Sequence, residues 1–244
     1  MKTQGSSSEL IVQELPKSVI AEAVRSVRTS VMFSMIDKPK KIIMVTSAVQ
    51  GEGKTFMASN LAYTIAQTGK ETLLIDTDLR KPRLNEVFGL TRKPGFSNHL
   101  LGECNLGSIV KTASVLNLSI ITCGIIPPNP SELLESTAME RFCDEIRDRF
   151  DIVIFDTPPA MTVTDAVVLS RYMDGIIITI KSGSTVKKTV KRCISQFTSS
   201  KCEILGAVIN YADIVKSGYY YHYYAHYYKY GYSSEKELQE VKSA

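Results

Sequence analysis

Short apolar runs alternate with longer amphipathic stretches along most of this chain. Several runs, such as Ile152 to Asp156, are almost continuously apolar, which is typical of strands buried on both faces of a sheet. The stretches between them have the apolar spacing of helices that pack on one side. The pattern predicts an α/β fold with a doubly wound, mainly parallel sheet flanked by helices. Expected strands are 41–46, 72–76, 118–122, 152–156, 175–180 and 204–209, and expected helices are 56–67, 137–149, 165–172 and 186–197.

Two segments lie outside this alternation. A helical pattern at about 18–35 precedes the first expected strand, and core periodicity ends at Asn210. We therefore expect one domain over residues 1–210 and a flexible tail over 211–244. The tail has nine tyrosines within fourteen residues, at Tyr219, Tyr220, Tyr221, Tyr223, Tyr224, Tyr227, Tyr228, Tyr230 and Tyr232. Tyrosine hydroxyls are possible phosphoryl acceptors, so the tail reads as a substrate.

Composition and charge narrow the class of protein. The 244 residues, 44% hydrophobic and 22% charged, fit one globular domain with a sizeable core. The net charge of +4 is too balanced to indicate nucleic acid as a partner. No apolar run approaches the length of a membrane span, and the five cysteines lack C-x-x-C spacing, as expected of reduced thiols in a cytosol.

The segment AVQGEGKT at 48–55 has the spacing of a phosphate-binding loop, between an expected strand and an expected helix. In such a loop, backbone N–H groups and the helix dipole bind phosphate oxygens. Lys54 would bridge the β- and γ-phosphates of ATP, and the Thr55 hydroxyl would bind Mg²⁺. The candidate nucleotide-binding residues are Gly51, Glu52, Gly53, Lys54, Thr55 and Phe56, with Asn210 at the end of the last expected strand.

Three aspartates follow expected strands. Asp76 and Asp78 lie in LLIDTDLRKP, and Asp156 lies in VIFDTPP. Because ligands bind outside the carboxyl ends of parallel strands, we expect all three beside the nucleotide. Asp78 and Asp156 are candidates for Mg²⁺ binding, and Asp76 is the candidate base for an incoming phenol. The alternative is that strand-end aspartates only cap the following turns.

Taken in order, these motifs resemble the bacterial tyrosine kinase (BY-kinase) family, in the form that is separate from its membrane adaptor. AVQGEGKT is similar to that family's Walker A motif, LLIDTDLRKP to its Walker A′, VIFDTPP to its Walker B, and residues 219–232 to its tyrosine cluster. The resemblance implies an ATP- and Mg²⁺-dependent tyrosine kinase that phosphorylates its own tail in trans and regulates capsular or extracellular polysaccharide synthesis and export. It implies a transmembrane adaptor, a cognate tyrosine phosphatase, other protein substrates, and a cytoplasmic location at the inner membrane face.

The leading helix carries a further match. Glu22, Arg25 and Arg28 form E-x-x-R-x-x-R, and three-residue steps leave these side chains on one broad flank of a helix. In the family this motif serves ring assembly, so the resemblance implies an intersubunit role here. From the residues alone, a local Glu22–Arg25 pair on a solvated face is the favoured explanation of the spacing.

A partition- or division-type ATPase of the same fold is the main alternative. Such relatives place a signature lysine where this chain has Val49, and one type ends in a membrane-binding amphipathic helix that residues 235–242 do not form. A protein kinase of the eukaryotic type is disfavoured by the absence of H-R-D and D-F-G patterns. A non-catalytic assembly module controlled by nucleotide binding stays open, because motifs establish binding better than turnover.

The last expected helix has a basic face. Lys187, Lys188, Lys191 and Arg192 recur at one-turn spacing, which suits either a solvated surface or contact with an adaptor, acidic lipid or a phosphorylated tail.

Overall fold

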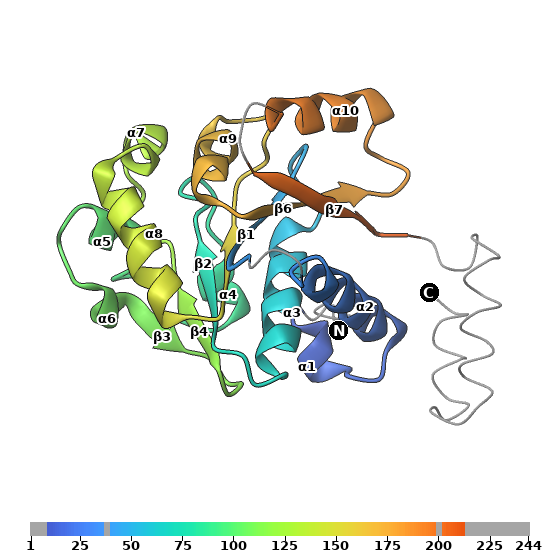
Figure 1. Ribbon diagram of the computed structural model, residues 1–244, viewed down its shortest axis with the longest axis horizontal. Helices are drawn as coiled ribbons and strands as arrows, with labels where there is room; N and C mark the ends of the chain where they lie inside the picture. Colours follow the sequence, from blue (N-terminus) through green and yellow to red (C-terminus); the bar gives the residue numbers. More distant parts are fainter. Residues whose placement is uncertain (1–8, 37–39, 199–201, 213–244) are drawn as a thin grey trace, which may run out of the picture.

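A seven-stranded sheet forms the centre of the protein (Figure 1). The computed structural model describes residues 9–36, 40–198 and 202–212, so the nine tail tyrosines lie outside the described residues. The strand order is β3-β4-β2-β5-β1-β6-β7. Every neighbouring pair is parallel except β3 with β4. The strands are β1 (Ile42–Ser47), β2 (Thr72–Asp76), β3 (Val110–Thr112), β4 (Leu118–Ile121), β5 (Ile152–Asp156), β6 (Gly175–Lys181) and β7 (Glu203–Asn210).

Helices cover both faces of the sheet (Figure 1). Alternate residues of β1 show the division, because Ile43 and Val45 pack with α2 and α3, whereas Ile42 and Met44 pack with α8 and α9. The helices are α1 (Ile11–Glu14), α2 (Val19–Phe33), α3 (Lys54–Ala66), α4 (Leu84–Val87), α5 (Phe96–Leu100), α6 (Leu106–Ile109), α7 (Pro130–Leu134), α8 (Thr137–Arg149), α9 (Asp165–Leu169) and α10 (Lys187–Gln196).

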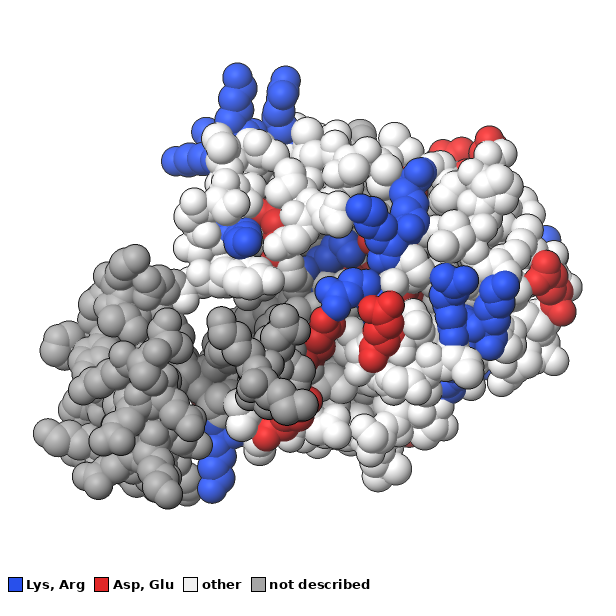
Figure 2. All heavy atoms as spheres, turned by 180° about the vertical axis from the view of Figure 1, so that it is seen from behind, with Lys and Arg blue, Asp and Glu red and all other residues white. Residues whose placement is uncertain are grey.

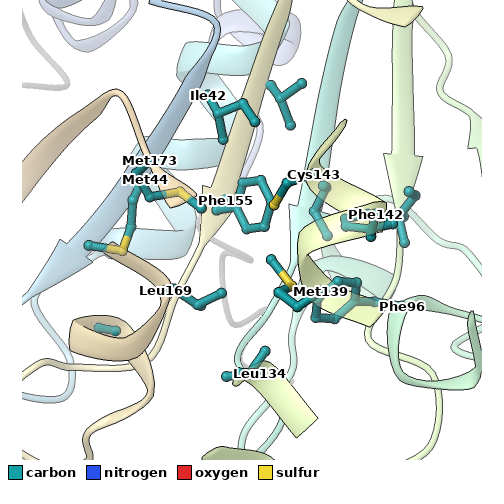
Figure 3. Packing of buried hydrophobic residues seen from close by; sticks show 14 of the residues in the cluster. Ile42, Met44, Phe96, Leu134, Met139, Phe142, Cys143, Phe155, Leu169 and Met173 are labelled. Atoms are coloured by element: carbon teal, nitrogen blue, oxygen red, sulfur yellow. The ribbon is translucent and has the colours of Figure 1, made fainter. Parts of the chain in front are cut away.

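Aromatic and sulfur-containing side chains fill the core on the α8 side (Figure 3). Phe96 and Phe142 meet edge to face with ring centroids 5.1 Å apart, and Met139 and Phe155 are fully buried beside them. On the other side, eleven residues of α3 are buried, because this helix lies between the sheet and α2. The first turn of α3 is thereby fixed against the carboxyl ends of the strands.

The six strands expected from apolar runs are confirmed within one residue at each end. Two details differ. β3 was not expected, because it is only three residues long and only partly buried, so it leaves no apolar run. The stretch 165–172 is not one helix: α9 ends at Leu169, and a single 3₁₀ turn continues it over Ser170–Tyr172.

Candidate active site

The parallel strands bring distant loops to one edge of the sheet. There, a cavity of about 1170 Å³ is lined by the phosphate-binding loop, the loop after β2, residues 158–163 and the end of β7. Its outer wall comes from α1 and α2, and α1 is fastened to α3 because Asn60 accepts a hydrogen bond from the backbone of Val12 at 3.1 Å. Phe56 lines the same cavity. The candidate nucleotide-binding residues are therefore gathered in one place.

Glu52 anchors the phosphate-binding loop through its side chain. Its carboxylate is 1% exposed and accepts hydrogen bonds from the backbone of Val49 at 2.8 Å and of Lys181 at 3.1 Å, and from the Thr185 hydroxyl. The sequence suggested only a backbone role for this residue. The side chain ties the loop to the end of β6, and a buried carboxylate with three donors is well satisfied.

Asn210, at the end of β7, also contacts the phosphate-binding loop. Its side-chain nitrogen donates to the backbone carbonyl of Glu52 at 3.1 Å, and its side-chain oxygen accepts from the backbone N–H of Tyr211 at 2.9 Å. Gly53 has φ +86°, and a Cβ there would lie 1.9 Å from the Asn210 amide nitrogen. The end of β7 and the phosphate-binding loop thus pack closely against each other.

Gly53→Ala should therefore cost more than Gly51→Ala. Both glycines have φ above +80°, but a Cβ at Gly51 meets nothing within 4 Å. We expect Gly51→Ala to lower the free energy of unfolding by about 1 kcal/mol through backbone strain. Gly53→Ala should cost about 2 kcal/mol, because Asn210 must also give up its hydrogen bond. Denaturant unfolding of both variants measures this, and equal costs would contradict the fit between Gly53 and Asn210.

Lys54 lies between two carboxylates. Its Nζ donates to Asp78 Oδ2 at 2.9 Å and lies 3.9 Å from Asp156 Oδ1. Burial alone would lower the pKa of Lys54, but the charges of Asp156 and Asp78 outweigh burial and raise it. The ammonium group is therefore held charged at the opening of α3, where phosphate oxygens would bind.

Only one of the two carboxylate oxygens of Asp156 accepts a hydrogen bond. Oδ2 accepts the Thr55 hydroxyl at 2.7 Å, whereas Oδ1 is buried without a hydrogen-bond partner. Burial raises the pKa of Asp156, against the opposing effects of Lys54 and Thr55. A buried acceptor beside a hydroxyl suits Mg²⁺, which takes few protein ligands and keeps water and phosphate oxygens. Within the described residues, no group of three or more His, Cys, Asp or Glu side chains could hold a metal ion.

Asp76 and Asp78 shape the loop after β2. Asp76 is fully buried, with Oδ1 accepting from the backbone of Asp78 and Oδ2 from those of Arg83 and Leu84. Burial, and next the nearby Asp156, raise the pKa of Asp76 to about 8. Asp78 Oδ1 accepts from the backbone of Arg80 and Lys81. Both aspartates thus cap the turn, which was the alternative suggested by the sequence, and both also lie near Lys54.

Arg80 is a cavity residue that the sequence did not single out. Its guanidinium donates two hydrogen bonds to the fully buried Asp165, at 2.9 and 3.1 Å, and Asp165 also accepts the Ser131 hydroxyl at 2.7 Å. The pair joins the loop after β2 to α9 and α7. The only sequence signal is that Arg80 follows Asp78 at the same strand end.

The E-x-x-R-x-x-R residues make local contacts on α2. Arg25 pairs with Glu22 at 2.8 Å and donates to the carbonyl of Pro16, and Arg28 donates to the carbonyl of Thr64 on α3 at 3.1 Å. Arg25 thus has the local pair expected from the spacing alone. Arg28 instead helps to dock α2 on α3.

Among the residues that the structure describes, no helix is long and apolar enough to cross a membrane.

The fold is shared with known proteins. A family profile described as an AAA domain matches residues 40–204. The chain is 39% identical to the tyrosine-protein kinase YwqD of Bacillus subtilis, over 90% of this chain and 94% of YwqD. It is 36% identical to the putative tyrosine-protein kinase CapB of Staphylococcus aureus, over 91% of this chain and 97% of CapB.

A solved structure agrees. The crystal structure of the chimerical protein CapA2B2 superposes with a TM-score of 0.80 at 37% identity, and the match covers 83% of this chain and 89% of the chimera. The parallel sheet is thus a feature of a family.

Proposed function

Because the chain belongs to the family of bacterial tyrosine kinases, we propose that it transfers the γ-phosphoryl group of ATP to tyrosine side chains, including those of its own tail. One observation carries most of the weight. A phosphate-binding loop whose lysine lies between two strand-end carboxylates occurs in a chain that also holds nine tyrosines within fourteen residues. The loop supplies the donor site, and the tail supplies the acceptors.

The reaction is an in-line displacement at phosphorus. The phenolic oxygen forms a bond to the γ-phosphorus, the bond from that phosphorus to the bridging oxygen breaks, and ADP leaves. Lys54 and the loop N–H groups would hold the phosphates in this geometry. Mg²⁺, when bound with ATP, would neutralise charge on the phosphates. Thr55 and Asp156 Oδ1 would hold the ion, with Asp78 acting through water.

The phenolic proton would go to Asp76. With a pKa of about 8, a minor fraction of Asp76 is ionised near neutral pH, and that fraction is basic enough to accept the proton. We expect Asp76→Asn to lower tyrosine labelling about a hundredfold, because general-base catalysis is lost. Nucleotide affinity should stay within about twofold, since Asp76 binds backbone groups and not phosphate. Quenched-flow labelling and nucleotide titration measure the two effects, and full labelling at unchanged affinity would remove Asp76 from this role.

The same pKa predicts a pH effect on the free protein. The folded chain keeps the Asp76 proton up to about pH 8, whereas the unfolded chain releases it near the ordinary value of 3.8. This group therefore makes folding less favourable as pH rises from about 4 to about 8. Asp76→Asn should flatten the dependence of the unfolding free energy on pH over this range. Urea unfolding at several pH values measures that dependence, and a dependence equal to that of the wild type would contradict the raised pKa.

The transfer would run between subunits. A tail that leaves the sheet after Asn210 need not reach its own nucleotide, but it can reach that of a neighbour in a ring. Glu22, Arg25 and Arg28 would form part of the ring interface. A transmembrane adaptor of a polysaccharide system would recruit and activate the kinase at the inner face of the membrane, and a cognate phosphatase would reverse the modification. The existence of the chimera CapA2B2 supports pairing with a second protein.

Intact-mass analysis after incubation with Mg²⁺ and ATP tests the proposal, with and without the cytoplasmic fragment of an adaptor. We expect mass increments, and phosphotyrosine mapping should locate them at residues 219–232. Hydrolysis of ATP with an unmodified tail under both conditions would instead favour a partition- or division-type switch ATPase.

A further inference from the structure

The outer face of α10 is a cluster of unpaired cations. Lys187, Lys188, Lys191 and Arg192 are all exposed. In the part of the chain that the structure describes, none of the four has an acidic partner within ion-pair distance. Buried Cys193 anchors the opposite side of the helix on the sheet. Figure 2 shows basic side chains projecting over α10, at the upper left. Four neighbouring cations without counter-charges form a ready surface for an anion.

The tail leaves the domain beside this surface. β6 and β7 are parallel, and Lys181 is paired with Asn210, so α10 begins at the edge of the sheet where β7 ends. The backbone of Ser182 donates to the carbonyl of Asn210 at 2.8 Å, which joins the start of the α10 connection to the base of the tail. From Ala212, seven residues reach Tyr219, a span of at most about 25 Å when extended. The basic face is therefore within reach of the tyrosine cluster.

Phosphorylation would make the tail complementary to this surface. Residues 219–232 contain Lys229 and no acidic residue, so the unmodified segment carries no negative charge that could pair with the four cations. Each phosphotyrosine adds about −1.5 to −2 charges and strong acceptor oxygens. Three such groups would carry more than enough charge to neutralise α10.

We propose that the basic face of α10 (Lys187, Lys188, Lys191 and Arg192) is the docking site for the phosphorylated tail of the same chain. This rests on the proposed function, which supplies the phosphates, and deepens it: docking on α10 keeps a phosphorylated tail out of neighbouring active sites. The modification then changes where the tail binds as well as its charge.

Binding of a synthetic peptide tests the site without any kinase activity. The probe is residues 217–232 with phosphotyrosine at Tyr224, Tyr227 and Tyr228, added to the full-length unphosphorylated protein and followed by fluorescence anisotropy. Glutamine replaces the cations in pairs, Lys187→Gln with Lys188→Gln and Lys191→Gln with Arg192→Gln, because it preserves helix propensity. The matched control is Arg92→Gln with Lys93→Gln, two exposed neighbours on the β4 side of the sheet.

Each α10 pair should weaken binding about threefold and the quadruple variant about tenfold, whereas the control stays within about twofold. The unphosphorylated peptide should not compete, and added salt should weaken binding of the phosphorylated one. Equal peptide affinity in the wild type, the quadruple variant and the control would overturn the proposal, provided that all melt at similar temperatures. Because the phosphates are synthetic, this result is independent of whether the chain itself transfers phosphate.

An anionic membrane is the competing occupant, since Val186 and Ile194 are exposed on the same helix. These two apolar side chains are fewer than interfacial helices bury, and for that reason the tail is favoured. Vesicles of phosphatidylserine and phosphatidylcholine provide the comparison. Vesicle binding that is lost in the quadruple variant, together with unchanged peptide binding, would assign the surface to lipid and overturn the proposal.

Discussion

Replacing Lys54 with Met should reduce phosphotransfer to tyrosine about a thousandfold, because the group that holds the β- and γ-phosphates in line is lost. The same change should destabilise the free protein. Without the ammonium group, the buried carboxylates of Asp78 and Asp156 face each other uncompensated, and removing one partner of a buried ion cluster costs about 3 kcal/mol. Because protonation of a carboxylate relieves the repulsion, the cost should grow as pH rises.

Single-turnover labelling with radioactive ATP measures the transfer, and urea unfolding at several pH values measures the stability. Lys70→Met serves as the control, since this lysine lies in the turn before β2, at the opposite edge of the sheet. A Lys54→Met protein that labels its tail at the wild-type rate would rule out the assigned phosphate-binding role.

Asp156→Asn should have opposite effects on activity and stability. Transfer should fall about a thousandfold, because the buried Oδ1 that suits the Mg²⁺ shell loses its charge. The free protein should become more stable, since one of three crowded, buried carboxylates is neutralised. The pKa of Asp76 should then fall toward its ordinary value, because the charge of Asp156 is, after burial, the largest cause that raises it.

Thermal melting without nucleotide, together with labelling at saturating Mg²⁺ and ATP, measures both effects. Asp151→Asn is the matched control, because Asp151 directly precedes β5, is exposed and accepts only the backbone N–H of Glu71. A lower melting temperature for Asp156→Asn would show that the carboxylate stabilises the free site, contrary to the crowding described here.

The residues of the site that could be predicted from the sequence are those whose motifs lie within a short stretch of the chain. The glycines and Lys54 follow one another in a single loop, and Asp76 and Asp156 each end an apolar run, so short-range patterns were sufficient to place them. The Glu52 side chain could not be assigned in this way. Its partners Lys181 and Thr185 are 129 and 133 residues away, and only the parallel pairing of β1 with β6 brings them together.

The Arg80–Asp165 pair illustrates the same limit. The two residues are 85 positions apart, and Asp165 opens a short helix at which an aspartate reads as an ordinary first-turn residue. Nothing local distinguishes it from a surface acid, although it is fully buried. Charge pairing across loops depends on the tertiary fold, so it could be found only once the strand order was known.

A mixing experiment tests most directly the central claim, that this chain phosphorylates tail tyrosines of a neighbour. One protein carries Lys54→Met and an intact tail, and the other has a normal phosphate-binding loop with all nine tail tyrosines changed to phenylalanine. Incubated together with Mg²⁺, ATP and the adaptor fragment, the Lys54→Met chain should gain phosphate on residues 219–232, although neither protein labels itself there. If the Lys54→Met chain stays unmodified while wild-type protein is labelled in parallel, transfer between subunits is wrong.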